Sequence, residues 1–167
     1  TTPDKPKGRK LILSPTPAKV WGQKHNIKVL DPISLKGNSE LVYSLQSTVY
    51  DLFLVASYGK IIPKEIFNIP ERKTLNIHPS LLPKYRGASP IESQILNGDK
   101  EIGVTIMQID EEMDHGGIVK RKEVNLPAGE AGIEKLKGRK ELEEILAEEG
   151  AKLFAEVASG WIAGEVE

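Results

Sequence analysis

Cysteine is absent from all 167 residues, and its absence excludes several kinds of site at once. Without thiols these residues can form no disulfide, no thiolate site for zinc or an iron–sulfur cluster, and no cysteine nucleophile. The three histidines, His25, His78 and His115, lie far apart in the sequence and form no HExxH pair. We therefore expect the protein to contain no metal site.

Long apolar runs and phosphate-binding glycine loops are also missing. The longest apolar runs, such as 52–56, are far shorter than the ~20 residues that cross a bilayer. Neither GxGxxG nor GxxxxGK[ST] occurs, which excludes the usual kinases, NTPases and dinucleotide dehydrogenases. No organelle-targeting pattern is visible. We expect a cytoplasmic protein without membrane contact, with the hydrophobic content of 39% that is usual for one globular domain.

The net charge of −1 conceals an uneven distribution of charge along the chain. Residues 1–28 contain seven basic side chains and one acidic side chain, whereas residues 128–167 contain five basic and ten acidic ones. A basic end can bind a polyanion such as a nucleic acid. A solvated loop at one end and an acidic surface helix at the other would explain the same composition.

Hydrophobic periodicity predicts that helices alternate with strands. Prolines and glycine make residues 1–17 a non-helical loop. The predicted strands span 27–30, 51–57, 74–78, 103–109 and 118–124. The predicted helices span 18–25, 38–49, 91–97 and 134–158, the last broken at Gly138 and Gly150 because interior glycine costs ~1 kcal/mol. This order predicts an α/β fold with a doubly wound, mostly parallel sheet, in which 51–57 is buried on both faces.

Asn76 and His78 end one of the predicted strands. Because they are two residues apart, their side chains share one face of the sheet. Ligands of doubly wound sheets bind beyond the carboxyl ends of the strands, where the loops 57–63, 79–87 and 110–117 are expected to meet. An amide donor and an imidazole suit acyl transfer, in which negative charge develops on a carbonyl oxygen. From these two residues alone, a hydrogen-bonded polar pair at a sheet edge is the preferred interpretation.

The loop 110–117 contains four acidic side chains and ends in a double glycine. A carboxylate that reached His78 from this loop would orient the imidazole and favour its protonated form. An acidic surface loop is the alternative, and the spacing does not fit a calcium-binding EF-hand.

Taken together, these segments resemble the folate-dependent N-formyltransferase family. The resemblance is carried by NIHPSLLPKYRGASPIESQILNGDKEIGVTIMQIDEEMDHGG and by the upstream DLFLVASYGKIIP. It runs from about Thr2 to Gly164 and implies a Rossmann-type, formyltransferase-like fold. Compared with the family pattern, residues 1–167 form a partial catalytic domain that lacks the usual first strands and the C-terminal barrel domain.

The resemblance also implies which residues perform the chemistry. Asn76, His78 and Asp114 correspond to the family's catalytic trio, which uses 10-formyltetrahydrofolate as formyl donor and no metal. The implied folate-binding positions are Tyr58, Lys60, Ile62, Ser80, Leu81, Leu82, Pro83, Asp110 and Met113.

The basic segment 3–17 is similar to an inserted loop with which the tRNA-acting members of the family grip the acceptor stem. Lys5, Lys7, Arg9 and Lys10 would neutralise phosphates there. The resemblance therefore implies formyl transfer to the amino group of the methionine carried by initiator tRNA. Three alternatives remain: a formyltransferase for an amino sugar or glycinamide ribonucleotide, a hydrolase of the formyl donor, and a catalytically silent folate- or RNA-binding fragment.

Overall fold

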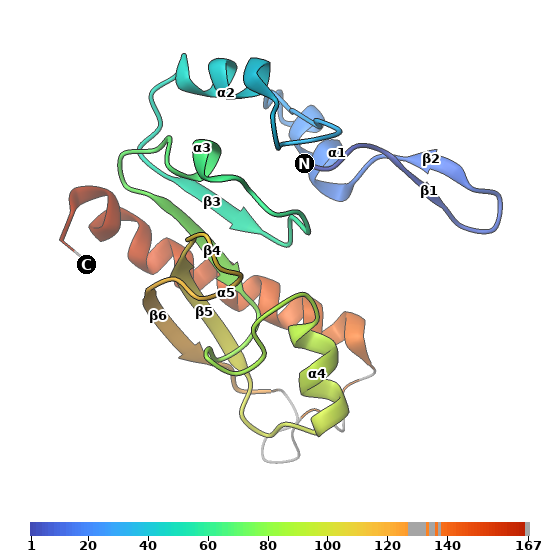
Figure 1. Ribbon diagram of the computed structural model, residues 1–167. Helices are drawn as coiled ribbons and strands as arrows, with labels where there is room; N and C mark the ends of the chain where they lie inside the picture. The colour runs from blue at the N-terminus through green and yellow to red at the C-terminus, as the bar shows by residue number, and fades with distance from the viewer. Residues whose placement is uncertain (127–132, 134–135, 137, 166–167) are drawn as a thin grey trace. The chain divides into compact units, whose positions relative to one another are not determined.

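The computed structural model describes residues 1–126, 133, 136 and 138–165 of the chain (Figure 1). The chain divides into two compact units. The first unit comprises Thr1–Thr48 with Lys60–Pro63, and the second comprises Val49–Gly59 with Lys64–Glu167. The polypeptide therefore leaves the first unit after Thr48 and returns to it for one short segment.

The first unit begins with an antiparallel hairpin of β1 (Lys5–Lys7) and β2 (Ile12–Ser14). Gly8 and Leu11 have φ of 70° and 49°, the left-handed conformation common in hairpin turns. The segment is non-helical, as the sequence predicts. Its two strands were not predicted. Strands of three residues, one of which contains a proline, carry too little alternation to be recognised in the sequence.

Two helices follow in the first unit, α1 (Pro17–Lys24) and α2 (Ser39–Gln46). The hydroxyl of Thr16 and the side chain of Asn38 cap them, so both predicted helices are confirmed. The strand predicted at 27–30 is wrong, since this segment is irregular. Among the described residues it has no neighbouring strand to pair its backbone groups, which an isolated strand would leave without partners.

The second unit is built on a four-stranded sheet with the order β3-β4-β5-β6. Its strands are β3 (Phe53–Ala56), β4 (Thr74–His78), β5 (Gly103–Gln108) and β6 (Ile118–Glu123). β3 and β4 are parallel, whereas the β4–β5 and β5–β6 pairs are antiparallel. Helices alternate with these strands, so the predicted α/β class is confirmed. Within this chain, the mostly parallel pairing that the sequence predicts applies to β3 and β4 and not to the two following pairs.

β3 lies at the edge of the described sheet, and Leu54 and Ala56 are exposed on one of its faces. The prediction that 51–57 is buried on both faces is therefore wrong for this chain. A strand that pairs on one side only, with one face uncovered, keeps a half-buried pattern even when nearly all of its residues are apolar.

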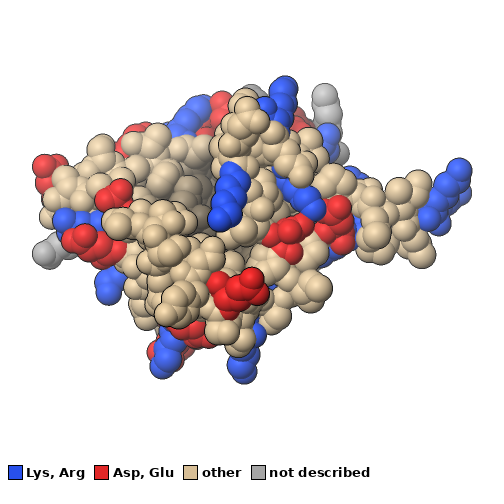
Figure 2. Space-filling view, turned by 90° about the horizontal axis from the view of Figure 1, so that it is seen from above, with Lys and Arg blue, Asp and Glu red and all other residues tan. Residues whose placement is uncertain are grey.

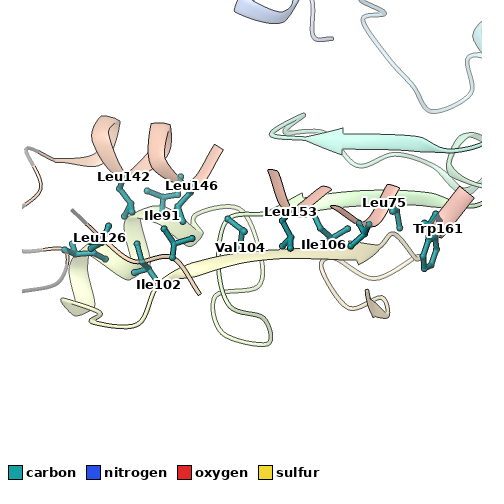
Figure 3. Close-up of a cluster of buried hydrophobic side chains, with 13 residues drawn as sticks. Leu75, Ile91, Ile102, Val104, Ile106, Leu126, Leu142, Leu146, Leu153 and Trp161 are labelled. Carbon is teal, nitrogen blue, oxygen red and sulfur yellow. The ribbon is translucent and has the colours of Figure 1, made fainter. Parts of the chain in front are cut away.

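One face of the sheet is covered by α5 (Arg139–Ala163), and α4 (Pro90–Asn97) packs against α5. The remaining helix, α3 (Lys64–Phe67), is a single turn. Figure 3 shows the resulting core, in which side chains of α5 meet those of β4 and β5. The α5 side chains recur every three or four residues, as an amphipathic helix requires. The buried positions are Leu142, Leu146, Gly150, Leu153, Val157 and Trp161.

Gly150 lies inside α5 and does not break it, contrary to the sequence prediction, whereas Gly138 lies directly before the helix. Gly150 continues the buried stripe of the helix. A Cβ atom at this position would come within 2.6 Å of Ile77 Cγ2, so the glycine allows a close approach of helix and sheet. This packing contact outweighs the low helix propensity of glycine.

The opposite face of the sheet is covered by the loop 79–87. The hydroxyl of Thr105 on β5 donates to Ser80 O at 2.7 Å and accepts from Leu82 N at 3.1 Å. A Cβ at Gly103 would lie 2.5 Å from Leu81 Cδ2, so this loop also lies close against the strand. Side chains of β4 that point away from α5 therefore point toward this loop.

We expect Gly150→Val to lower the free energy of unfolding by about 1–3 kcal/mol, because the added methyl groups overpack the contact with Ile77. Urea unfolding followed by circular dichroism measures the change. The matched control is Ala151→Val at the exposed neighbouring position, which should change it by about half a kcal/mol. Equal midpoints for the two variants would contradict the close-packing argument.

Candidate active site

β4 ends with the two polar side chains that the sequence singles out. Asn76 and His78 lie on the face of β4 that points away from α5, about 6.6 Å apart along the strand. His78 is buried, with 3% of its surface exposed, whereas Asn76 is half-buried. The Asn76 carboxamide makes no hydrogen bond to any residue that the structure describes. It therefore has free donors beside the imidazole.

The His78 ring is oriented by the main chain. Its Nε2 lies 2.9 Å from the carbonyl oxygen of Tyr85. Because a carbonyl oxygen can only accept, Nε2 carries a proton and donates it. Nδ1 is then the nitrogen that gains or loses a proton, and it lies 3.6 Å from Asp114 Oδ1. That distance is too long for a hydrogen bond, so Nδ1 faces the carboxylate and remains available to a third group.

Asp114 reaches this position from the loop between β5 and β6. Its backbone is left-handed, with φ of 53°, a conformation that is unfavourable for a residue with a side chain. Two donors from the loop 79–87 hold it: Gly87 N donates to Oδ2 at 2.8 Å, and Arg86 Nε donates to the main-chain oxygen at 2.9 Å. The structure thus brings His78 and Asp114 together across 36 residues of sequence.

The segment Ser80–Pro83, predicted to bind folate, is largely engaged with the protein itself. The Ser80 side chain is fully buried and donates to Lys84 O at 2.6 Å, and Leu82 is 1% exposed. Arg121 donates to Leu82 O at 2.6 Å. Leu81 is half-buried and Pro83 is exposed, so these two side chains are the accessible part of the segment.

The other predicted folate-binding residues are divided between the two units. Asp110 and Met113 are exposed on the same loop as Asp114. Tyr58 belongs to the second unit and is half-buried, and this burial raises the pKa of its phenol. Lys60 and Ile62 belong to the first unit, where Lys60 donates to the carbonyl oxygens of Pro32 and Ile33.

The predicted tRNA-binding residues are all exposed on β1 and its turn. They are Lys5, Lys7, Arg9 and Lys10. None of the four forms an ion pair with any described residue. Figure 2 shows basic side chains at the far end of this hairpin.

Lys19 on α1 behaves differently from the four hairpin residues. It lies 2.6 Å from Asp31 and 2.8 Å from Asp4, and hydrogen bonds to these two carboxylates raise the pKa of Lys19 above its ordinary value. The charge of Lys19 is therefore neutralised within the protein, while the charges of the hairpin face solvent.

Charge is segregated between the two units. By sequence, the first unit contains nine basic and three acidic residues, and the second contains fourteen basic and twenty-one acidic residues. The basic end noted in the sequence is thus a property of one structural unit. Such a surface attracts polyanions.

Within the described residues, no group of three or more His, Asp or Glu side chains is arranged to hold a metal ion. None of the helices described is both long enough and apolar enough to cross a membrane.

Sequence reasoning did not identify the groups that hold His78 and Asp114 in place. The carbonyl of Tyr85 and the amide of Gly87 are main-chain groups, whose partners no pattern of side chains reveals. Arg86 and Thr105 act through side chains, but their partners are distant in the sequence. Their only sequence signal is that they neighbour the residues implied by the family resemblance.

Comparison with known proteins identifies the family of this chain. The family model described as formyl transferase matches residues 1–151. The methionyl-tRNA formyltransferase of Sulfurihydrogenibium sp. is 42% identical over 167 residues, which is 100% of this chain and 51% of that protein. The chain therefore spans about half the length of this relative.

Solved structures with the same fold include two further formyltransferases. The phosphoribosylglycinamide formyltransferase of Bacillus halodurans has a TM-score of 0.65 at 28% identity, covering 79% of this chain and 68% of that one. A 4-N formyltransferase of Francisella tularensis has a TM-score of 0.66 at 25% identity, covering 90% and 56%. The resemblance and the formyltransferase-like α/β fold inferred from the sequence are thereby confirmed. The chain belongs to the formyl transferase family.

Proposed function

We propose that this chain carries the catalytic site of a methionyl-tRNA formyltransferase, which transfers a formyl group from 10-formyltetrahydrofolate to the amino group of methionine on initiator tRNA. The observation that carries the proposal is the His78–Asp114 pair, 3.6 Å apart, beside an Asn76 carboxamide with no partner among the described residues. The methionyl-tRNA formyltransferase that is 42% identical over the whole chain supports the choice of acceptor. A cytoplasmic location stays a prediction.

The residues present suit a formyl donor that is held by loops. Leu81, Pro83 and Met113 offer accessible apolar surface on the two loops that carry the site, and such surface can contact a flat heterocycle. Tyr58 and Asp110 are further proposed donor contacts in the same unit, and Ser80 and Leu82 are buried behind the accessible residues. Lys60 and Ile62, which belong to the other unit, stay predictions from the family resemblance.

In the proposed reaction, the amine nitrogen forms a bond to the formyl carbon. The bond from that carbon to the donor nitrogen then breaks, and a proton passes from the amine to the donor nitrogen. Negative charge develops on the formyl oxygen as the amine attacks. The free Nδ2 donor of Asn76 and the protonated Nδ1 of His78 stabilise that charge, since fixed donors lower the barrier where charge appears. Asp114 stabilises the imidazolium and helps to remove the amine proton.

The basic hairpin favours tRNA over a small acceptor. Four unpaired positive charges, exposed on one short hairpin, neutralise phosphates and give salt-dependent, largely sequence-independent affinity. An amino sugar or glycinamide ribonucleotide has little use for such a surface. If the chain were only a binding fragment, or a hydrolase of the formyl donor, the assays below would detect no formyl transfer to the amine.

Asn76→Ala and Asp114→Asn should each lower kcat by about 10²–10³, because each removes a group that acts on the developing charge or on the imidazolium. Single-turnover formylation of methionyl-tRNA measures the loss, with thermal melting to show that the variants remain folded. Asn68→Ala, at an exposed asparagine after α3, is the matched control and should keep its turnover. Near-normal turnover in either site variant would reject the assignment.

Replacing Lys5, Lys7, Arg9 and Lys10 by glutamate should abolish tRNA binding and leave folate binding intact. Replacing the same four residues by neutral side chains should reduce the slope of log K for tRNA binding against log salt concentration by about 3. Each phosphate contact contributes ~0.7–0.9 to that slope. Filter binding at several salt concentrations measures both effects. The control makes the same charge change at Lys36, Lys73, Lys100 and Lys140, all exposed elsewhere. Equal losses in both quadruple variants would show a net-charge effect and contradict a hairpin site.

A further inference from the structure

Three consecutive residues, Tyr85, Arg86 and Gly87, hold both members of the proposed catalytic pair. The Tyr85 carbonyl accepts from His78 Nε2 at 2.9 Å, and the Gly87 amide donates to Asp114 Oδ2 at 2.8 Å. Between them, Arg86 Nε donates to the main-chain oxygen of Asp114 at 2.9 Å. One short turn thus sets the histidine and the aspartate relative to each other.

Hydrogen bonds to residues outside the catalytic pair hold the turn in place. The Tyr85 hydroxyl accepts from Asn97 Nδ2 at 3.1 Å, at the end of α4, and a side-chain hydrogen bond to Asp99 raises the pKa of Tyr85. Ser80 Oγ donates to Lys84 O at 2.6 Å, so the residue before the turn is bound to Ser80. Because these contacts fix the start of the turn, the turn can act as a reference for the acidic loop.

Asp114 needs such a reference. Its left-handed backbone is a conformation that persists only where surrounding contacts impose it. The Gly87 amide fixes the carboxylate, but it does not fix the backbone from which the carboxylate extends. Arg86 is the side chain that holds this backbone, through the Asp114 carbonyl.

The guanidinium of Arg86 is fixed by a second acceptor. Its Nη1 lies 3.0 Å from His115 Nε2, and because arginine has no acceptor, His115 Nε2 must accept. The proton of a neutral His115 is then on Nδ1, which faces Glu112 Oε2 at 3.7 Å. The planar fork of arginine can serve Asp114 O and His115 Nε2 together, which a single ammonium on a flexible stem cannot do as well.

We propose that Arg86 is a positioning residue for formyl transfer: it fastens the loop 110–117 to the turn 85–87 and so sets Asp114 against His78. This inference rests on the proposed function for its effect on turnover. Arg86 contacts neither the His78 ring nor the Asp114 carboxylate. It acts on the reaction through the backbone of Asp114.

The test compares Arg86→Ala and Arg86→Lys with the wild-type chain. We expect Arg86→Ala to lower kcat by about 10-fold to 100-fold, the size of effect that a small misplacement of a catalytic group produces, with KM for the formyl donor within about twofold. Ethylguanidinium added to Arg86→Ala should restore part of the lost kcat, whereas Arg86→Lys should remain impaired. In an Asp114→Asn background, Arg86→Ala should cause no further loss, because the group that it positions is already gone.

The matched control is Arg139→Ala, which removes an equally exposed arginine whose partners are Glu92 and Glu143. It should leave kcat and KM unchanged. Unchanged kcat in Arg86→Ala, or a full additional loss in the Asp114→Asn background, would overturn the proposal.

A second measurement does not depend on activity. Amide hydrogen exchange at Gly87, followed by NMR, reports the bond from Gly87 N to Asp114 Oδ2. Exchange should become at least about tenfold faster in Arg86→Ala and stay unchanged in Arg139→Ala. If the wild-type chain transfers no formyl group, the proposed function fails, yet this exchange still decides the positioning role. Unchanged exchange at Gly87 in Arg86→Ala overturns it.

Discussion

The hydrogen bond from His78 Nε2 to the Tyr85 carbonyl is the constraint on which the site depends. It commits one ring nitrogen to the main chain and leaves Nδ1 as the atom that changes protonation state. Because Nδ1 then faces Asp114 without a hydrogen bond, it remains available to a reacting group. The chemistry proposed for Asn76 and Asp114 follows from this choice of nitrogen, since a reversed ring would turn Nδ1 away from the carboxylate.

Side chains alternate between the two faces of the sheet, so the residues of the core and those of the proposed site lie on opposite faces. Leu75 and Ile77 on β4 point toward α5 and the core, while Asn76 and His78 point to the opposite face. Gly150 lets α5 approach Ile77 closely, so the strand that carries the site is fixed from behind. A rigid strand with a polar face can hold half-buried donors that would be costly in a packed core.

Charge adds a second division, between the two units of the chain. The first unit carries the exposed, unpaired cations of the hairpin, and the second carries the acidic loop and most of the glutamates. The proposed polyanion contacts and the proposed catalytic residues thus belong to different units of the chain.

The sequence by itself determined the α/β class, most of the helices and strands, and the face shared by Asn76 and His78, because periodicity and caps are local properties. It misjudged the irregular segment 27–30, the open face of β3 and the role of Gly150, which depend on what lies beside each element. The family resemblance singled out Asp114 among the four acidic residues of its loop, whereas only the tertiary structure decided which ring nitrogen of His78 faces it and which groups hold both. Those contacts join residues far apart in the chain, several of them through main-chain atoms, and no pattern of side chains encodes a hydrogen bond from a backbone amide.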